Sequence, residues 1–153
     1  MAAKTETYTA SVSWIGGHRG HLQLGNGPEM DFSAPPDSQG EAGVLTPEDA
    51  FVGAVNTCVM LMFIWAAERF RLDLVSYDCP AEGTKLIELD RTEIFTKVVL
   101  RPRIVVRAGQ EAVDAVEKRV CRALQSAQKF SLVANSIKGE VVLDPEIAIK
   151  AGS

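Results

Sequence analysis

The most constraining feature of this 153-residue sequence is a nearly all-apolar segment, residues 50–67, which reads AFVGAVNTCVMLMFIWAA. A helix that crosses a bilayer needs roughly 20 predominantly apolar residues. Asn56 and Thr57 interrupt this segment, and the unbroken apolar run, residues 58–67, is only ten residues long before the charged Glu68. The segment therefore predicts a buried core helix rather than a membrane span. In so small a chain, dimerisation is the natural way to cover its second side.

Composition restricts the class of protein further. Hydrophobic residues make up 46% of the sequence and the formal net charge is −4, which excludes disorder as the main state. With 16 basic against 20 acidic residues, the chain has no net attraction for phosphate, so we expect no nucleic-acid partner. Cys58, Cys79 and Cys121 are an odd number of cysteines without a zinc-binding spacing, which argues against a disulfide framework. The first seven residues lack the apolar stretch of a secretory signal. These features predict a reduced, cytoplasmic protein with no membrane partner.

The first third of the chain is predicted to be β-structure. Residues 7–14 alternate polar and apolar side chains and are rich in Thr, Val and aromatic residues, as a half-buried strand requires. Glycine-containing turns then separate two further short strands, predicted at residues 21–24 and 29–32. A loop is predicted at residues 33–43.

The sequence Thr46-Pro47-Glu48-Asp49 predicts the start of a helix, with Thr46 as the N-cap, Pro47 at the first helical position and acids in the first turn. This helix should extend to about Phe70. After it, the sequence predicts a meander of three strands at residues 72–77, 84–89 and 93–106, and then a second helix at residues 110–128. A short helical piece after residue 130, a last strand at residues 140–143 and a tail from residue 145 onward complete the prediction. The whole is predicted to be one α+β domain, residues 1–153, with its core at about residues 7–143.

Three local motifs in this order carry a family resemblance. They are Gly-Gly-His-Arg-Gly at residues 16–20, Thr-Pro-Glu-Asp-Ala-Phe at residues 46–51, and Ala-Val-Asn-Thr-Cys at residues 54–58. In this order and spacing the chain resembles the OsmC/Ohr family of thiol peroxidases, which reduce organic hydroperoxides. The most specific part is the Thr-Pro-Glu-x-x-Phe…Cys run, in which the acid precedes the cysteine by ten residues.

The resemblance implies a role for three residues and a quaternary structure. Cys58 matches the family's peroxidatic cysteine, Arg19 its peroxide-site arginine, and Glu48 the carboxylate that holds that arginine. The family fold is an intertwined homodimer in which antiparallel sheets wrap two long central helices and the active sites lie at the subunit interface. This agrees with the apolar helix predicted above.

Family members also carry a second, resolving cysteine near the end of the second helix, in a Cys-Pro-x-Ser-Asn context. Here Asn135 fits that context, but Ser131 stands in place of the cysteine. Serine cannot form a disulfide, so a Cys58 sulfenic acid would await an external thiol. Cys121 precedes Ser131 by ten residues on the same predicted helix, roughly 15 Å away, and is a poor substitute. Cys79, at a strand end, is better interpreted as a packed or edge thiol.

The chemistry needs each of the three residue types. Only a thiolate attacks the peroxide bond, and a free cysteine has a pKa of about 8.5 that an adjacent arginine lowers. An arginine fork can pair with the thiolate and polarise peroxide oxygens, while a carboxylate offsets its buried charge. Taken singly, each residue has a structural alternative. Cys58 could be a small core residue on the stripe Phe51, Val55, Cys58 and Met62, Glu48 an ordinary first-turn acid, and Arg19 a solvated turn residue.

Two functions remain open from the sequence. The first is an organic hydroperoxide reductase that uses an external thiol and neither a metal nor another cofactor, with an apolar pocket beside Cys58 lined by some of Phe51, Met60, Met62, Phe63 and Trp65. His18 and His21, near Glu29 and Asp31, are more typical of a solvated loop than of a metal site. The alternative is a non-enzymatic dimer of the same fold that binds a small apolar ligand, a hypothesis that Ser131 favours. A third possible role, as the structural partner of another protein, leaves no mark that can be found in the sequence.

Overall fold

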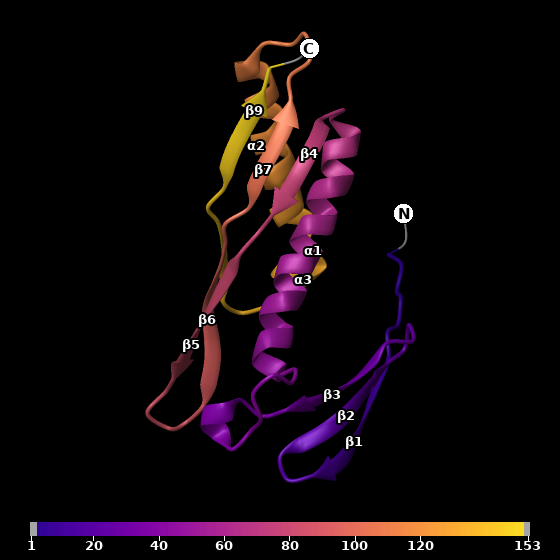
Figure 1. Cartoon of the computed structure of the whole chain (residues 1–153), viewed down its shortest axis with the longest axis vertical. Helices are drawn as coiled ribbons and strands as arrows, with labels where there is room; N and C mark the ends of the chain where they lie inside the picture. The colour runs from indigo at the N-terminus through magenta and orange to yellow at the C-terminus, as the bar shows by residue number, and fades with distance from the viewer. Residues whose placement is uncertain (1–2, 152–153) are drawn as a thin grey trace. The chain divides into compact units, whose positions relative to one another are not determined.

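A computed structural model describes residues 3–151 and shows an α+β protein of sheets and helices, as predicted (Figure 1). The described chain forms two compact units, whose boundary in the sequence lies between Phe51 and Val52.

The first unit contains an antiparallel sheet in the order β1-β2-β3, formed by Ala10–Gly16, Arg19–Leu24 and Glu29–Ser33. The three predicted strands are thus confirmed, with ends shifted by up to three residues. Gly16 and Gly17 both have positive φ angles, of 116° and 54°, which a glycine adopts without strain in the turn from β1 to β2. The loop after β3 contains a short 3₁₀ helix, η1 (Pro36–Ser38), and returns to the sheet where the Ser33 N–H donates to Leu45 O at 2.9 Å.

The predicted helix start is confirmed. Helix α1 spans Pro47–Arg69, and the Asp49 N–H donates to Thr46 Oγ1 at 3.1 Å, the bond expected of an N-cap. The length of the helix corrects one prediction. At 23 residues, or roughly 34 Å, α1 is long and apolar enough to cross a bilayer by length and composition alone. The prediction that it is too short was wrong because it counted only the unbroken apolar run, whereas a helix continues through polar residues.

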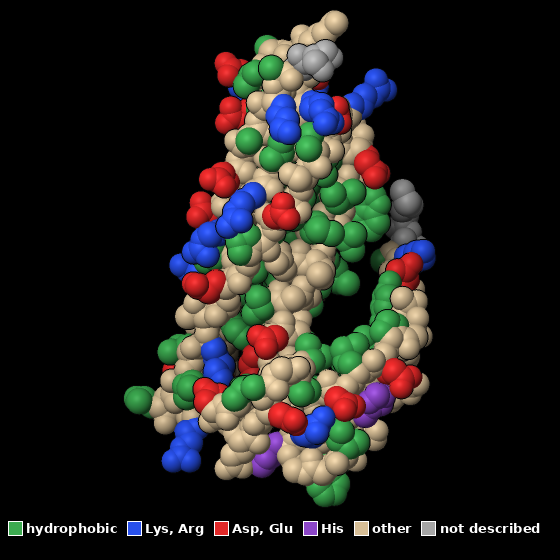
Figure 2. Space-filling view, viewed as in Figure 1, with side chains coloured by type: hydrophobic (Ala, Val, Ile, Leu, Met, Phe, Trp, Pro, Cys, Tyr) green, Lys and Arg blue, Asp and Glu red, His purple; other side chains and the backbone are tan. Residues whose placement is uncertain are grey.

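The burial of α1 within one chain is partial, as expected of a helix that one small chain cannot cover on both sides. Only 28% of its most apolar 18-residue stretch is buried. The buried residues form one stripe: Val55, Val59, Phe63, Ala66 and Ala67. Other apolar side chains of the helix, including Leu61 and Trp65 at 47% and 53% exposure, reach the surface, and Figure 2 shows hydrophobic side chains along α1. Within one chain, α1 is therefore a half-covered helix, and its burial by a second chain stays a prediction.

The second unit has two three-stranded sheets that together correct the predicted meander. One sheet has the order β4-β7-β9 and the other the order β5-β6-β8. The strands are β4 (Asp73–Asp78), β5 (Ala81–Ile87), β6 (Glu93–Leu100), β7 (Arg103–Arg107), β8 (Glu140–Leu143) and β9 (Glu146–Lys150). The pairs β4–β7 and β5–β6 are antiparallel, whereas β6–β8 and β7–β9 are parallel. Residues 145 onward were predicted to be a tail, but β9 pairs with β7 along its whole length.

Prolines explain why the single strand predicted at residues 93–106 is divided. Pro102 has no N–H to donate and separates β6 from β7; Pro80 and Pro145 occupy the matching breaks between β4 and β5 and between β8 and β9. Backbone hydrogen bonds still cross this row, from Arg101 N to Pro80 O at 3.0 Å and from Glu146 N to Pro102 O at 2.9 Å. The sheets are therefore joined end to end at a row of prolines.

Two more helices complete the second unit. Helix α2 (Val113–Phe130), the predicted second helix, has a strongly amphipathic sequence and buries one stripe: Val116, Val120, Ala123, Leu124 and Ala127. Its Gln128 Nε2 donates to Val141 O in β8 at 2.7 Å. The predicted short helical piece is α3 (Leu132–Ser136). Helix α1 packs on β4 through Phe63 and Tyr77, whose ring centroids are 5.3 Å apart.

Candidate active site

Cys58 lies in the middle of α1, beside the buried stripe but not on it. The stripe of the structure contains Val55, Val59 and Phe63, while Cys58 is partly exposed. The predicted stripe of Phe51, Val55, Cys58 and Met62 is therefore not the buried stripe of the helix within one chain, since only Val55 of the four is buried. Its sulfur has one polar neighbour among the described residues: the Ser131 hydroxyl donates a hydrogen bond to Cys58 Sγ at 3.2 Å.

Ser131 is held between two helices by its own hydrogen bonds. It follows the last residue of α2 and precedes the first residue of α3, with an extended backbone (φ −68°, ψ 117°). Its side chain is completely buried, and its Oγ accepts a hydrogen bond from the Ala134 N–H at 3.2 Å, as an N-cap does. Asn135 Nδ2 donates to Lys129 O at 2.9 Å and ties α3 to the end of α2. The bend that presents Ser131 to Cys58 is thus fixed on both sides.

The other two cysteines have different surroundings. Cys79 is partly buried, its carbonyl accepts a hydrogen bond from Asn56 Nδ2 at 2.9 Å, and burial raises the pKa of its thiol. A raised pKa reduces the thiolate fraction, so Cys79 is a poor nucleophile. Together with Met60 and Tyr77 it lines a concavity of about 110 Å³, which is small beside the roughly 300 Å³ or more of typical ligand pockets. Cys121 is exposed on α2.

The apolar side chains predicted to line a pocket beside Cys58 have different environments. Phe63 is completely buried and packs against Tyr77, whereas Trp65 is mostly exposed. Met60 lines the small concavity near Cys79.

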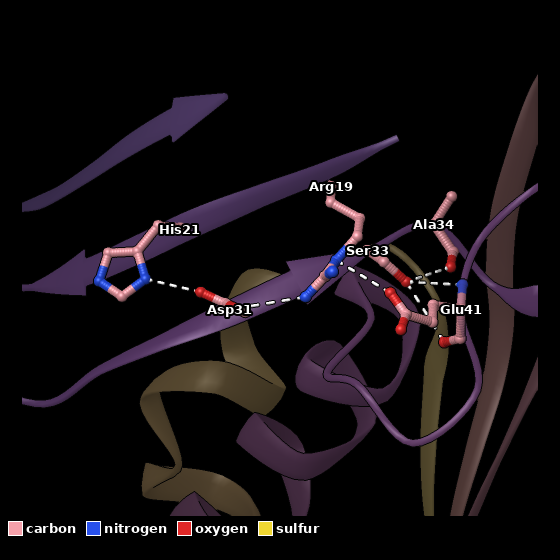
Figure 3. Close-up of polar contacts among 6 residues, drawn as sticks. All are labelled: Arg19, His21, Asp31, Ser33, Ala34 and Glu41. Carbon is pink, nitrogen blue, oxygen red and sulfur yellow. Dashed lines mark hydrogen bonds and ion pairs between the residues drawn. The ribbon is translucent and has the colours of Figure 1, made fainter. Parts of the chain in front are cut away.

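Arg19 lies on β2 of the first unit and is part of a charged network (Figure 3). Its Nη2 donates to Asp31 Oδ2 at 3.3 Å, and its Nε lies 3.0 Å from Glu41 Oε2. Asp31 also pairs with His21, whose two ring nitrogens lie 2.8 Å from Asp31 Oδ1 and 3.0 Å from Glu29 Oε1. The hydrogen bonds to Asp31 and Glu29, in that order, raise the pKa of His21, because both ring nitrogens can donate only in the imidazolium form.

Glu48 lies in the first turn of α1, partly buried, and its expected pairing with Arg19 is not among the ion pairs of the described residues. The carboxylates that hold Arg19 here are Asp31 and Glu41, which the motifs in the sequence did not indicate. Asp31 could have been found from the strand register, because it lies directly opposite His21 and diagonal to Arg19. Glu41 comes from the irregular loop after β3, where no periodic pattern indicates a neighbour.

Comparison with known proteins identifies the class. The sequence model of the family described as OsmC-like protein matches residues 40–146, which is more than half of the chain. The chain therefore belongs to the OsmC-like protein family, and the resemblance noted from its motifs is confirmed.

Individual relatives are more distant. The chain is 25% identical over 147 residues to the uncharacterized protein YmaD of Bacillus subtilis, covering 92% of this chain and 93% of that protein. An OsmC-like protein of unknown function from Vibrio cholerae has a similar structure, with a TM-score of 0.82 at 24% identity, over 92% of this chain and 99% of the other. An organic hydroperoxide resistance protein OsmC from Legionella pneumophila aligns with a TM-score of 0.70 at 20% identity, over 95% and 99%. At these identities the structural likeness establishes the fold alone.

Proposed function

We propose that this protein reduces organic hydroperoxides with the thiolate of Cys58, as a one-cysteine peroxidase that an external thiol returns to its reduced form. The observation that carries the proposal is the 3.2 Å contact between Ser131 Oγ and Cys58 Sγ. Position 131 is where the family resemblance expects the resolving cysteine, so the second position of a two-cysteine site adjoins the first but has no sulfur. The name of the structurally similar Legionella protein, an organic hydroperoxide resistance protein, supports the same class of substrate.

The proposed cycle consists of one oxidation of Cys58 by the peroxide and two exchanges with external thiol. The Cys58 thiolate attacks one peroxide oxygen, an S–O bond forms and the O–O bond breaks, and the departing alkoxide takes a proton to become an alcohol. Sulfur is oxidised by two electrons to sulfenic acid, and the peroxide is reduced by two. An external thiol then attacks the sulfenic sulfur, giving a mixed disulfide and water, and a second thiol releases Cys58 with formation of the external disulfide.

Arg19 and Glu48 have their proposed roles from the resemblance. In the proposal, Arg19 binds the peroxide oxygens and favours the thiolate, because a guanidinium presents forked donors and a permanent charge. The ion pairs of Arg19 with Asp31 and Glu41 support a preorganised side chain, since they restrict its rotamers before substrate arrives. Glu48 is proposed as a further carboxylate that limits the cost of the arginine's charge.

We also propose that the working form is a homodimer in a reducing, cytoplasmic setting. The support is the half-covered α1, whose exposed Leu61 and Trp65 leave apolar area that a second chain would bury. Light scattering over a concentration series should give twice the chain mass, and Trp65→Glu should weaken association. A monomer at every concentration would contradict this part of the proposal.

The decisive test is consumption of cumene hydroperoxide by the pre-reduced protein, with Cys58→Ser as the control. We expect rapid consumption of one equivalent, and turnover only when a dithiol or glutathione is added separately. Mass spectrometry after one equivalent should detect Cys58 sulfenic acid, and an intramolecular disulfide involving Cys58 would exclude the one-cysteine cycle. Consumption no faster than that of Cys58→Ser would refute the peroxidase and favour the ligand-binding alternative.

A further inference from the structure

The hydrogen bond between Ser131 and Cys58 has a direction that matters for reactivity. A serine hydroxyl has one hydrogen to donate and two lone pairs to accept with. Ser131 Oγ already accepts from the Ala134 N–H, and it donates to Cys58 Sγ at 3.2 Å. Accepting one hydrogen bond polarises the O–H group and strengthens the bond that it donates.

The two protonation states of Cys58 accept this hydrogen bond unequally. A neutral thiol sulfur is a weak acceptor, whereas a thiolate is charged and a strong one. A donor held against the sulfur therefore favours the thiolate. Because Ser131 is completely buried, a water molecule does not readily take the place of its hydroxyl as donor when the side chain is truncated to alanine.

We infer that Ser131 is a positioning residue of the Cys58 site, whose buried hydroxyl, oriented by Ala134 N–H, stabilises the Cys58 thiolate by hydrogen bonding. The residue at the resolving position thus promotes the first step of the cycle, although it cannot perform the second. The inference deepens the proposed function and rests on it for its biological meaning, but its test uses no peroxide.

The test is the rate of alkylation of Cys58 by iodoacetamide over a pH series, followed peptide by peptide with mass spectrometry. Ser131→Ala should raise the pH midpoint of Cys58 alkylation by roughly one to two units, since hydrogen bonds to charged groups are worth about that much. The rate below both midpoints should fall by about 3- to 10-fold, while the plateau at high pH should rise a few-fold, because thiolate nucleophilicity increases with pKa. An unchanged midpoint in folded Ser131→Ala would overturn the inference.

Two controls separate this effect from a structural one. Ser136→Ala removes a hydroxyl from the same helix, where Ser136 Oγ donates to Leu132 O, and should leave the midpoint unchanged. The Cys121 peptide, from an exposed thiol in the same sample, reports any change in the reagent and should react alike in all variants. A change in the plateau rate without a change in the midpoint would indicate that Ser131 only shapes the loop, and would also overturn the inference.

A second variant keeps the test decisive if Ser131→Ala does not fold. Reduced Ser131→Cys is nearly isosteric, and its thiol is a weaker donor than a hydroxyl, so the Cys58 midpoint should again rise. After one equivalent of cumene hydroperoxide this variant should lose two hydrogens, as a disulfide forms between Cys58 and the introduced cysteine and water is released. A midpoint equal to that of the wild type would contradict the inference. Loss of peroxide consumption with the midpoint shift intact would instead refute only the proposed function.

Discussion

The cysteine site of the second unit and the arginine network of the first unit are both polar, but different forces hold them in place. Cys58 and Ser131 have short side chains, Ser131 is completely buried, and packed helices set their distance. Arg19 and its partners Asp31 and Glu41 are charged side chains with 37%, 46% and 52% exposure. Exposed ion pairs are weak and screened by salt, whereas a buried contact changes only when the packing around it changes. The two regions should therefore respond to different perturbations.

The largest expected effect contrasts packing with exposed charge. Phe63→Ala removes a completely buried ring from α1, five residues beyond Cys58, and should lower the free energy of unfolding by about 3–5 kcal/mol. Asp31→Asn, which removes one carboxylate of the exposed network, should lower it by at most about 1 kcal/mol. Urea denaturation of both variants checks the comparison. Equal losses would show that the charged network is as important to stability as the core.

The next effect separates activity from stability in the arginine network. Arg19→Gln should slow cumene hydroperoxide consumption by about 100-fold, the usual cost of removing one charge-stabilising donor, with less than about 1 kcal/mol of stability lost. Arg19→Lys keeps the charge without the fork and should recover only part of the rate. Initial rates with pre-reduced protein provide the measurement. Full activity in Arg19→Gln would remove this residue from the proposed site.

A smaller effect concerns the hydroxyl that adjoins the sulfur. Ser131→Ala should lower the free energy of unfolding by about 1–2 kcal/mol, because it removes the cap of α3 and leaves the Ala134 N–H without its acceptor. Ser136→Ala is the matched control, since Ser136 is exposed on the same helix, and should change stability by less than about 0.5 kcal/mol. Equal effects of the two substitutions would contradict the assigned cap.

The smallest effect is the pH response of the charged network. The carboxylates Asp31 and Glu29 raise the pKa of His21, so the folded form binds its proton more tightly than the unfolded chain does. This contribution to stability is complete below the unfolded value of about 6.5 and is lost as the pH rises through the folded pKa. Proton NMR should show the His21 ring titrating above 6.5, and the titration should move down in Asp31→Asn and in high salt. His18→Gln assigns the signals, because the chain has two histidines.

Local signals predicted some elements well and failed on others for identifiable reasons. Thr46-Pro47 predicted the start of α1 because a helix N-cap involves only neighbouring residues. The meander was wrong because strand order depends on which distant segments pair, and the β4–β7 and β7–β9 pairs join segments far apart in the sequence. The tail from residue 145 was wrong for the same reason, since β9 is a strand by virtue of its pairing with β7.

The candidate site divides in the same way. The motif around Cys58 indicated the candidate nucleophile, and the absence of a cysteine at Ser131 suggested the proposed one-cysteine cycle, because both are statements about residue type. The partners of Arg19 required the fold: Asp31 depends on the register of β2 and β3, and Glu41 on the path of a loop. The proposed pairing of Arg19 with Glu48 could be named from the sequence but not located by it.

Residue identities alone establish the chemistry available to this protein: a single candidate nucleophile in a family motif, no sulfur at the resolving position, and a helix too apolar to stand alone in water. The packed fold was needed to show that the Ser131 hydroxyl donates to the Cys58 sulfur and that Arg19 pairs with Asp31 and Glu41. The physical reason is the range of the interactions. Caps, turns and apolar periodicity act between residues a few positions apart, whereas a hydrogen bond between positions 58 and 131 exists only after two helices have packed.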